Sequence, residues 1–207
     1  MLYAISGFAG SGKDTIADYL IKEYQFTKVS FAASVKDAVS VIFSWDRELL
    51  EGSTLESRAW REEIDDWWAT RLNIPSLTPR FVMQNFGTDI MRKHFHDDIW
   101  IASVQRKIQG LNGRIVITDA RFPNELKTVK QENGTLIRVK RGSDPDWVES
   151  AIQYNLHPNT STKPKKLDNI HPSEYSWLGT NFDYVLENNS TIVSLYEKID
   201  KIVRKTI

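Results

Sequence analysis

Residues 2–20 read LYAISGFAGSGKDTIADYL, and this stretch decides the fold. The apolar run at residues 2–5 predicts a short buried strand, and Ile16 and Leu20 recur at the spacing of one helix face. Three glycines and Lys13 lie between these two elements. A strand, a glycine-rich turn and a helix in this order predict an α/β sheet whose first turn binds phosphate.

Short apolar runs and amphipathic helices continue to alternate along the rest of the chain. The expected strands lie at residues 29–31, 115–118, 136–140 and 184–186. The expected helices lie at residues 35–43, 81–95 and 101–111, from about residue 124, and at 192–203. We therefore predict an α/β P-loop NTPase fold, in which a parallel sheet of about five strands is flanked by helices.

Two segments interrupt this alternation. Residues 44–79 are charged and rich in tryptophan, which predicts a helical insertion on the acceptor side, and the spacing of Trp60, Trp67 and Trp68 predicts a buried helix face. Residues 142–179 hold four of the seven prolines and many polar residues. A segment of that composition is typical of a functional loop, so we expect a lid over a nucleotide.

The composition is that of a globular chain without a strong electrostatic field. Its 27 basic residues balance its 27 acidic residues, so net charge attracts neither nucleic acid nor an anionic membrane. The chain has no cysteine and no run of about 18 apolar residues. We expect one cytoplasmic domain, residues 1–207, that binds neither nucleic acid nor membrane, while a homodimer stays open.

The turn at residues 7–13 satisfies the glycine and lysine positions of the Walker A pattern. Gly10, Ser11, Gly12 and Lys13 are predicted to hold the phosphates of ATP through backbone N–H groups and the lysine ammonium. The alternative is a glycine-rich turn that only caps a helix. A strand before the turn and a helix after it favour the phosphate site.

The next position departs from the pattern. The Ser or Thr that usually ligates Mg²⁺ is replaced by Asp14, and Thr15 follows it. A carboxylate at this position could bind Mg²⁺ directly or through water, or it could orient the acceptor. The Mg²⁺ ligand is therefore open among Asp14, Thr15 and a third acid described below.

Four residues beyond the tryptophan-rich insertion follow helical spacing and would form one stripe: Arg80, Gln84, Gly87 and Thr88. An arginine offers a planar fork to a monophosphate, and a glutamine can bind a base edge. Gly87 would let a base or sugar approach the backbone. The alternative interpretation is a solvated helix face.

The strand expected at residues 115–118 is followed by an acid and an arginine, Asp119 and Arg121. Ligands bind at the carboxyl edge of a parallel sheet. Asp119 resembles a Walker B acid suited to Mg²⁺, and Arg121 could neutralise charge on a transferring phosphoryl group. Glu125 could instead form a structural pair with Arg121 at a helix start.

In combination these motifs resemble the bacteriophage deoxynucleoside monophosphate kinases, and the resemblance covers most of the chain. It rests on Ser11-Gly12-Lys13-Asp14-Thr15, Arg80-x-x-x-Gln84-x-x-Gly87-Thr88-Asp89, Trp100, Asp119-x-Arg121-x-x-x-Glu125 and His171-Pro172-Ser173-Glu174. The chain departs from the family at Phe81, where members often carry a second basic residue.

The resemblance implies phosphorylation of deoxynucleoside 5′-monophosphates to diphosphates by ATP with Mg²⁺, in the host cytoplasm if the chain is viral. It implies catalytic roles for Lys13, Asp14, Arg80, Asp119 and Arg121, with Asp14 and Asp119 as Mg²⁺ ligands. Arg141 is implied beside the ATP phosphates at Gly10–Thr15. Substrate contacts are implied for Arg80, Gln84, Gly87, Thr88, Trp100, Asp119, Arg121, Glu125, His171 and Glu174. The alternatives are a P-loop kinase for another small phosphorylated acceptor and a non-catalytic ATP-dependent switch.

Overall fold

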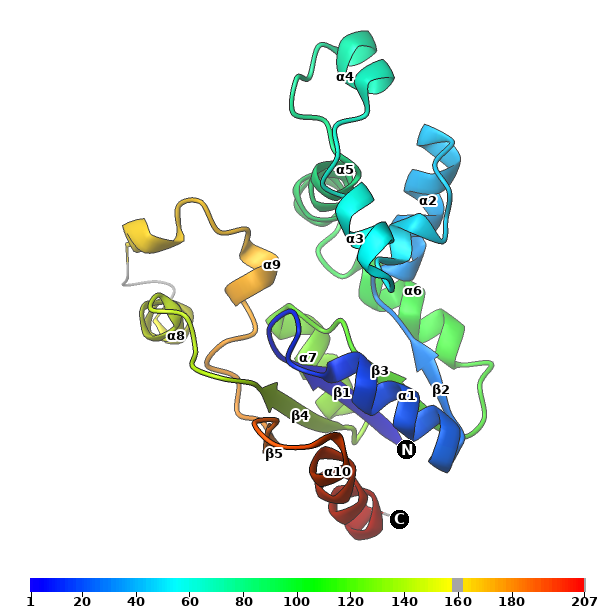
Figure 1. The fold of residues 1–207 in the computed structure, drawn as a ribbon, viewed down its shortest axis with the longest axis vertical. Coiled ribbons are helices and arrows are strands. Elements are labelled where there is room, and N and C mark those ends of the chain that lie inside the picture. The colour runs from blue at the N-terminus through cyan, green and yellow to red at the C-terminus, as the bar shows by residue number, and fades with distance from the viewer. Residues whose placement is uncertain (158–161, 207) are drawn as a thin grey trace. The chain divides into compact units, whose positions relative to one another are not determined.

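The computed structural model describes residues 1–157 and 162–206. These residues form a five-stranded sheet in the order β2-β3-β1-β4-β5, in which all neighbouring strands are parallel (Figure 1). The strands are β1 (Leu2–Ser6), β2 (Phe26–Val29), β3 (Arg114–Ile117), β4 (Thr135–Lys140) and β5 (Tyr184–Glu187). The predicted α/β fold with a parallel sheet of about five strands is confirmed.

Helices connect the strands and form most of the remaining chain. The α-helices are α1 (Lys13–Tyr24), α2 (Ala33–Phe43), α3 (Leu55–Trp60), α4 (Asp66–Leu72), α5 (Pro79–Gln84), α6 (Ile99–Ile108), α7 (Pro123–Gln131), α8 (Val148–Leu156), α9 (Pro172–Tyr175) and α10 (Ile192–Thr206). Two 3₁₀ helices, η1 (Leu49–Glu51) and η3 (Lys165–Leu167), and a π-helix, η2 (Asn85–Phe95), complete the set. Within residues 1–157 and 162–206, none of these helices has the length and apolar character needed to cross a membrane.

The second strand lies earlier in the chain than the sequence predicted. β2 ends at Val29, which pairs with Ile117 of β3, whereas the expected strand covered residues 29–31. Only the first and last residues of β2 are buried. This pattern lacks the two-residue alternation of a half-buried strand, so periodicity alone misplaced it.

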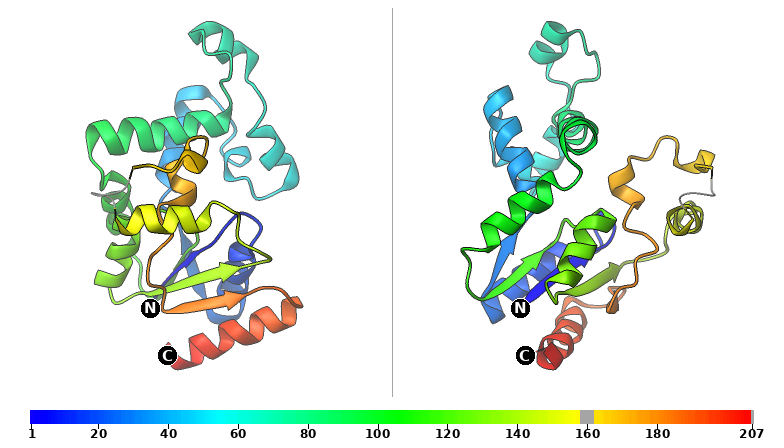
Figure 2. Two further views of the ribbon diagram at one scale, coloured as in Figure 1. Left: turned by 90° about the vertical axis from the view of Figure 1, so that its left-hand side faces the viewer. Right: turned by 180° about the vertical axis from the view of Figure 1, so that it is seen from behind.

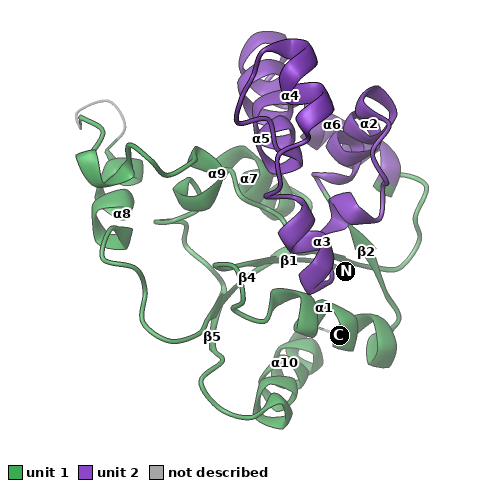
Figure 3. Cartoon of the chain, turned by 45° about the horizontal axis from the view of Figure 1, so that its top comes forward, with its two compact units in different colours: residues 1–30, 108–207 green, residues 31–107 purple. Residues whose placement is uncertain are grey.

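The main core lies on one face of the sheet, beneath α1 and α10. Tyr3 and Ile5 of β1, two residues apart, point to this face and pack with Ile16 of α1 and Ile199 of α10. Helix α7 covers the opposite face over β1 and β4 (Figure 2 and Figure 3). Helices on both faces explain why the strands are apolar on both sides.

The chain forms two compact units (Figure 3). Unit 1 comprises residues 1–30 and 108–207 and contains the sheet with α1 and α7 to α10. Unit 2 comprises residues 31–107 and contains α2 to α6. The predicted insertion at residues 44–79 lies within unit 2, and the assignment of residues 1–207 to one domain stays a prediction.

Trp60, Trp67 and Trp68 do not share one helix face, contrary to the sequence prediction. Trp60 ends α3, whereas Trp67 and Trp68 belong to α4, which begins after Asp65. The Asp65 side chain caps α4 by accepting the backbone N–H of Trp68 at 3.0 Å. Trp67 is 63% exposed. A capping aspartate between the tryptophans therefore starts a new helix and separates their faces.

The expected helix at residues 81–95 is α-helical only in its first part. Helix α5 begins at Pro79, capped by the Thr78 hydroxyl, and the chain then continues as the π-helix η2. A π-helix has more residues per turn than an α-helix, so faces assigned from α-helical spacing no longer hold beyond residue 85. π-Helical turns occur frequently at functional sites.

The polar segment at residues 142–179 contains more helix than its composition predicted. It includes α8, η3 and α9, and residues 158–161 lie outside the described part of the chain. Val148 and Ala151 bury one face of α8. The predicted role of this segment as a lid stays a prediction.

The core of unit 1 yields a stability prediction. Ile199→Ala removes a fully buried side chain of α10, and we expect it to lower the free energy of unfolding by about 2–5 kcal/mol. The control is Val193→Ala in the same helix, which is 61% exposed and should cost less than about 0.5 kcal/mol. Urea denaturation followed by circular dichroism measures both, and equal losses would contradict the assigned core.

Candidate active site

The phosphate loop at residues 7–13 joins β1 to α1, as predicted. Gly12 precedes α1 with a φ of 106°, and Gly7 has a φ of 152°. A Cβ on Gly7 would lie 2.3 Å from the carbonyl oxygen of Val139, and one on Gly12 would lie 2.6 Å from Nδ2 of Asn188. Both positions therefore require glycine, because β4 and the chain after β5 pack directly against the loop.

Lys13 is positioned by a contact within the loop, and Ser11 by a contact with Asn188, which follows β5. The ammonium group of Lys13 donates to the carbonyl oxygen of Phe8 at 2.9 Å, so its side chain folds back over the turn. Asn188 donates from Nδ2 to the carbonyl oxygen of Ser11 at 2.8 Å, and its own N–H donates to Lys140 at 2.7 Å. Asn188 thus connects the loop to the ends of β4 and β5.

Asp14 occupies the first turn of α1 and forms an ion pair that the sequence did not reveal. Its Oδ1 accepts from the Lys28 ammonium at 2.9 Å and from the Thr118 hydroxyl at 3.3 Å. Burial, the largest single influence, raises the pKa of Asp14, but the hydrogen bond and the charge of Lys28 outweigh it. The pKa of Asp14 is therefore lowered from its usual value, and the group is a carboxylate at neutral pH.

Asp119 lies at the carboxyl end of β3, as predicted. Its Oδ2 accepts from the Ser30 hydroxyl at 2.7 Å. Ser30 and Lys28 lie two residues apart at the end of β2, so one strand end contacts both acids. The sequence analysis missed Lys28 and Ser30 because it expected the second strand at residues 29–31. With the strand at its observed position, these two polar residues lie at its carboxyl end.

Asp14, Thr118 and Asp119 provide oxygen donors of the kind that Mg²⁺ prefers. Among the described residues, no cluster of three or more His, Cys, Asp or Glu forms a self-contained metal site. Mg²⁺ usually keeps several waters and is held by one or two carboxylates together with substrate phosphates. Two acids beside a phosphate loop therefore fit a Mg²⁺ ion that arrives with a nucleotide.

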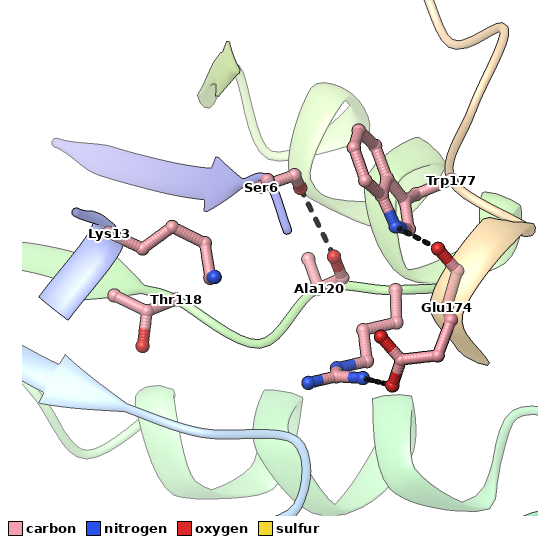
Figure 4. Close-up of a pocket in the computed structure, with 8 residues that line it drawn as sticks. Ser6, Lys13, Thr118, Ala120, Glu174 and Trp177 are labelled. Atoms are coloured by element: carbon pink, nitrogen blue, oxygen red, sulfur yellow. Dashed lines mark hydrogen bonds and ion pairs between the residues drawn. The ribbon is translucent and has the colours of Figure 1, made fainter. Parts of the chain in front are cut away.

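A small pocket lies at the same edge of the sheet (Figure 4). It is lined by Ser6, Gly7, Lys13, Thr118, Ala120, Arg121, Glu174 and Trp177. Lys13 points into it from one side, and Glu174 and Trp177 lie on the other side (Figure 4). The pocket therefore brings together groups from the phosphate loop, the chain after β3 and the segment around α9.

Arg121 and Glu125 have different environments. The Arg121 guanidinium donates to Oε1 of Glu174 at 2.5 Å, and both side chains are partly exposed. Glu125 is only 3% exposed, and its carboxylate accepts the backbone N–H groups of Arg121 at 2.7 Å and Phe122 at 3.1 Å. Glu125 therefore shapes the loop that carries Arg121, and its predicted contact with substrate stays a prediction.

Other predicted residues of unit 1 lie around this region. The His171 ring caps α9 by accepting the backbone N–H of Ser173 at 3.3 Å, and its Nδ1 lies 2.8 Å from the Ser173 hydroxyl. Thr15 is partly buried in the first turn of α1, and Arg141 is exposed just after β4. Their predicted contacts with nucleotide stay predictions.

The predicted acceptor stripe lies in unit 2. Arg80 forms an ion pair with Glu62, and Gln84 and Thr88 are partly exposed. Gly87 is buried, and a Cβ there would lie 3.4 Å from both methyl groups of Val35. Gly87 is therefore a packing position in this structure, and its predicted contact with a base stays a prediction.

Trp100 is also a packing residue. It is buried in α6, and its indole N–H donates to the carbonyl oxygen of Gly87 at 2.8 Å. Backbone carbonyl groups in a π-helix depart from the regular α-helical ladder, so an added donor stabilises this turn. The predicted contact of Trp100 with substrate stays a prediction.

The chain matches the model of a known protein family. The sequence model of the family "deoxynucleotide monophosphate kinase" matches residues 52–155, which is half of the chain. The match includes the predicted acceptor residues of unit 2 together with Asp119, Arg121 and Glu125. It excludes the phosphate loop, so the evidence from the loop is independent of it.

Viral relatives align over most of the chain. A protein of Acanthamoeba polyphaga mimivirus, provisionally named as a deoxynucleotide monophosphate kinase, is 29% identical over 96% of this chain and 94% of its own. The deoxynucleoside-5′-monophosphate kinase of Escherichia phage T5 is 27% identical over 84% of each chain. The deoxynucleotide monophosphate kinase of Escherichia phage RB69 is 23% identical over 98% of this chain and 99% of its own.

Similarity to solved structures is weaker. The dephospho-CoA kinase of Campylobacter jejuni is 12% identical with a TM-score of 0.48, over 99% of this chain and 96% of its own. A likeness at that level says nothing about the substrate.

The ion pair of Asp14 yields a pH prediction. Because the pKa of Asp14 is lowered in the folded chain, its contribution to stability is present above the unfolded value of about 3.9 and is lost as pH falls through the folded value. Lys28→Met should raise the pKa of Asp14 towards its usual value and weaken this acid dependence. Carboxyl NMR titration of both proteins measures the change.

The matched control for this titration is Lys22→Met in α1, because Lys22 is exposed and pairs with Glu23 instead. This variant should leave the titration of Asp14 unchanged. If Lys28→Met also leaves it unchanged, the ion pair between Lys28 and Asp14 does not set the pKa.

Proposed function

The chain belongs to the deoxynucleotide monophosphate kinase family and is a nucleotide kinase, and we propose that it transfers the γ-phosphoryl group of ATP to a deoxynucleoside 5′-monophosphate, giving the diphosphate and ADP. The single observation that supports this reaction best is the shared pocket of Lys13, from the phosphate loop, and Arg121. Two cations at one sheet edge suit the transfer of a phosphoryl group between two anions.

The phosphate loop binds the donor. Its N–H groups lie at the positive end of α1, which favours the β- and γ-phosphates of ATP. Lys13 exchanges its hydrogen bond with the Phe8 carbonyl for phosphate oxygens, which carry a formal negative charge and are better acceptors. Asn188 keeps the Ser11 peptide in place during this exchange.

Asp14 and Asp119 would hold Mg²⁺, which neutralises charge on the β- and γ-phosphates when it is bound. Lys28 and Ser30 orient these two carboxylates from the end of β2. Without such partners, two acids beside a triphosphate would repel it. The Lys28 ammonium therefore makes an aspartate compatible with a position that usually carries Ser or Thr.

The acceptor phosphate attacks the γ-phosphorus in line with the bond that breaks. An oxygen of the monophosphate forms the new P–O bond, and the bond to the β,γ-bridging oxygen breaks as ADP leaves. The attacking group is already an oxyanion, so no strong general base is needed. Arg121 stabilises negative charge on the transferring group, and Arg80 with Gln84 binds the acceptor's phosphate and base.

A kinase assay with a series of candidate acceptors tests the reaction directly. ADP production from ATP and Mg²⁺ should depend on an added deoxynucleoside monophosphate when dAMP, dGMP, dCMP and dTMP are offered separately with their ribose counterparts. Turnover of another small phosphorylated acceptor alone would assign a different kinase. Background rates with all acceptors, together with intact ATP binding, would favour a nucleotide-dependent switch.

Lys13 is the residue whose removal should matter most. Lys13→Ala should lower kcat by at least about a hundredfold, because it removes the mobile charge on the transferring phosphate. The thermal midpoint should stay within a few degrees, since Lys13 is only partly buried and its hydrogen bond to the Phe8 carbonyl lies within the turn. The control is Lys22→Ala in the same helix, which should keep full activity; retained activity in Lys13→Ala contradicts the assignment.

A further inference from the structure

The second residue of the phosphate loop is an aromatic one, and it contacts two tryptophans. The ring of Phe8 lies 5.1 Å from the ring of Trp177 and 5.6 Å from the ring of Trp147, both in edge-on geometry. Both tryptophans belong to the segment at residues 142–179. Edge-to-face packing is a favoured aromatic arrangement, so Phe8 connects the loop to this segment.

Trp177 continues the connection towards Arg121. It is only 3% exposed, and its indole N–H donates to the backbone carbonyl of Glu174 at 3.0 Å (Figure 4). The carboxylate of Glu174 accepts from the guanidinium of Arg121. A series of direct contacts therefore joins Phe8, Trp177, Glu174 and Arg121.

Trp177 is itself held in place from β4. The guanidinium of Arg138 lies over its ring at 5.3 Å from the centroid, which is a cation–π contact. Arg138 is fixed in turn by two hydrogen bonds of 3.1 Å to the carboxylate of Asp144. A buried ring with neighbours on several sides has little freedom to move on its own, so its motion follows that of Phe8.

We propose that Trp177 is a positioning residue that makes the placement of Arg121 depend on the phosphate loop. The inference rests on the proposed function, because it assigns Arg121 to the transferring phosphoryl group. Glu174 holds Arg121 through an ion pair. When phosphates enter the loop, Phe8 shifts, Trp177 shifts with it, and the carbonyl of Glu174 moves the acid that holds Arg121.

These contacts imply an order of events in the proposed reaction. Arg121 is released from Glu174 only after the donor has filled the loop, so the cation that stabilises the transferring group becomes available when ATP is present. Trp177 lines the pocket with Lys13 and Arg121, and in this scheme it acts on the reaction through Glu174 and Arg121. Its effect is therefore expected in kcat and not in the affinity for ATP.

The experiment compares Trp177→Phe with Trp147→Phe. The first keeps an aromatic ring beside Phe8 and removes the N–H that binds Glu174, so kcat should fall about three- to tenfold, the change expected for one neutral hydrogen bond. The KM for ATP should change less than about twofold. Trp147→Phe changes the other tryptophan beside Phe8, whose contact to Phe8 an aromatic ring preserves, and its kcat should stay within about twofold of the parent.

Phe8→Leu supplies the second measurement, and it is also the substitute if Trp177→Phe fails to fold. It removes the aromatic edge from the loop while keeping the backbone carbonyl that Lys13 binds. Because Phe8 and Trp177 act in series, the double variant should lose no more kcat than the worse single variant, whereas independent effects would multiply. The thermal midpoints of the same four proteins show whether any coupling belongs to stability instead.

Unchanged kcat in folded Trp177→Phe, an equal loss in Trp147→Phe, or multiplying losses in the double variant each overturn the proposal. Hydrogen exchange of residues 7–13 gives a readout without turnover, since Trp177→Phe should alter how these amides respond to ATP. The activity of the parent protein separates the two hypotheses: a parent that lacks kinase activity contradicts the proposed function, while an active parent whose kcat and hydrogen exchange do not depend on Trp177 contradicts only this inference.

Discussion

The close approach of the phosphate loop to β4 and to the chain after β5 is the constraint on which the site depends. Gly7 leaves no space for a Cβ beside the carbonyl of Val139, and Gly12 leaves none beside Asn188. Strand β4 pairs directly with β1, so the loop after β1 has to turn over the end of β4. The glycines therefore serve packing as well as the proposed binding of phosphate, because the same missing side chains allow both.

The order of the strands decides which charges surround this loop. β2 and β1 both flank β3, so Lys28, Asp14 and the polar residues after β3 meet at one edge of the sheet. A carboxylate in the first turn of α1 is favoured by the positive helix end, and Lys28 offsets its charge against a phosphate. Asp14 and Lys28 therefore act together as an ion pair whose charges offset each other.

Glu125 and Glu174 each follow a proline by two positions, but they have different functions in this fold. Glu125 is buried and holds the loop backbone, which leaves Glu174 to hold the guanidinium of Arg121. A buried carboxylate that accepts two backbone N–H groups is a structural element, because moving it would leave those donors unsatisfied. The residues predicted to bind the acceptor, Arg80, Gln84 and Thr88, belong to unit 2.

Sequence patterns determined the class of the fold and the position of the glycine-rich turn between its first strand and first helix. These patterns are the strand, turn and helix of residues 2–20 and the acid and arginine after β3. Each lies within a short stretch of chain, so the spacing of its residues is enough to recognise it. The exact extent of β2, the π-helix after Gln84 and the helices within residues 142–179 were not predicted, since hydrogen bonding and burial from distant segments override local periodicity there. Only the tertiary structure paired Lys28 with Asp14 and Trp177 with Phe8. Contacts between residues far apart in the chain cannot be predicted from local sequence patterns, because those patterns depend only on neighbouring residues.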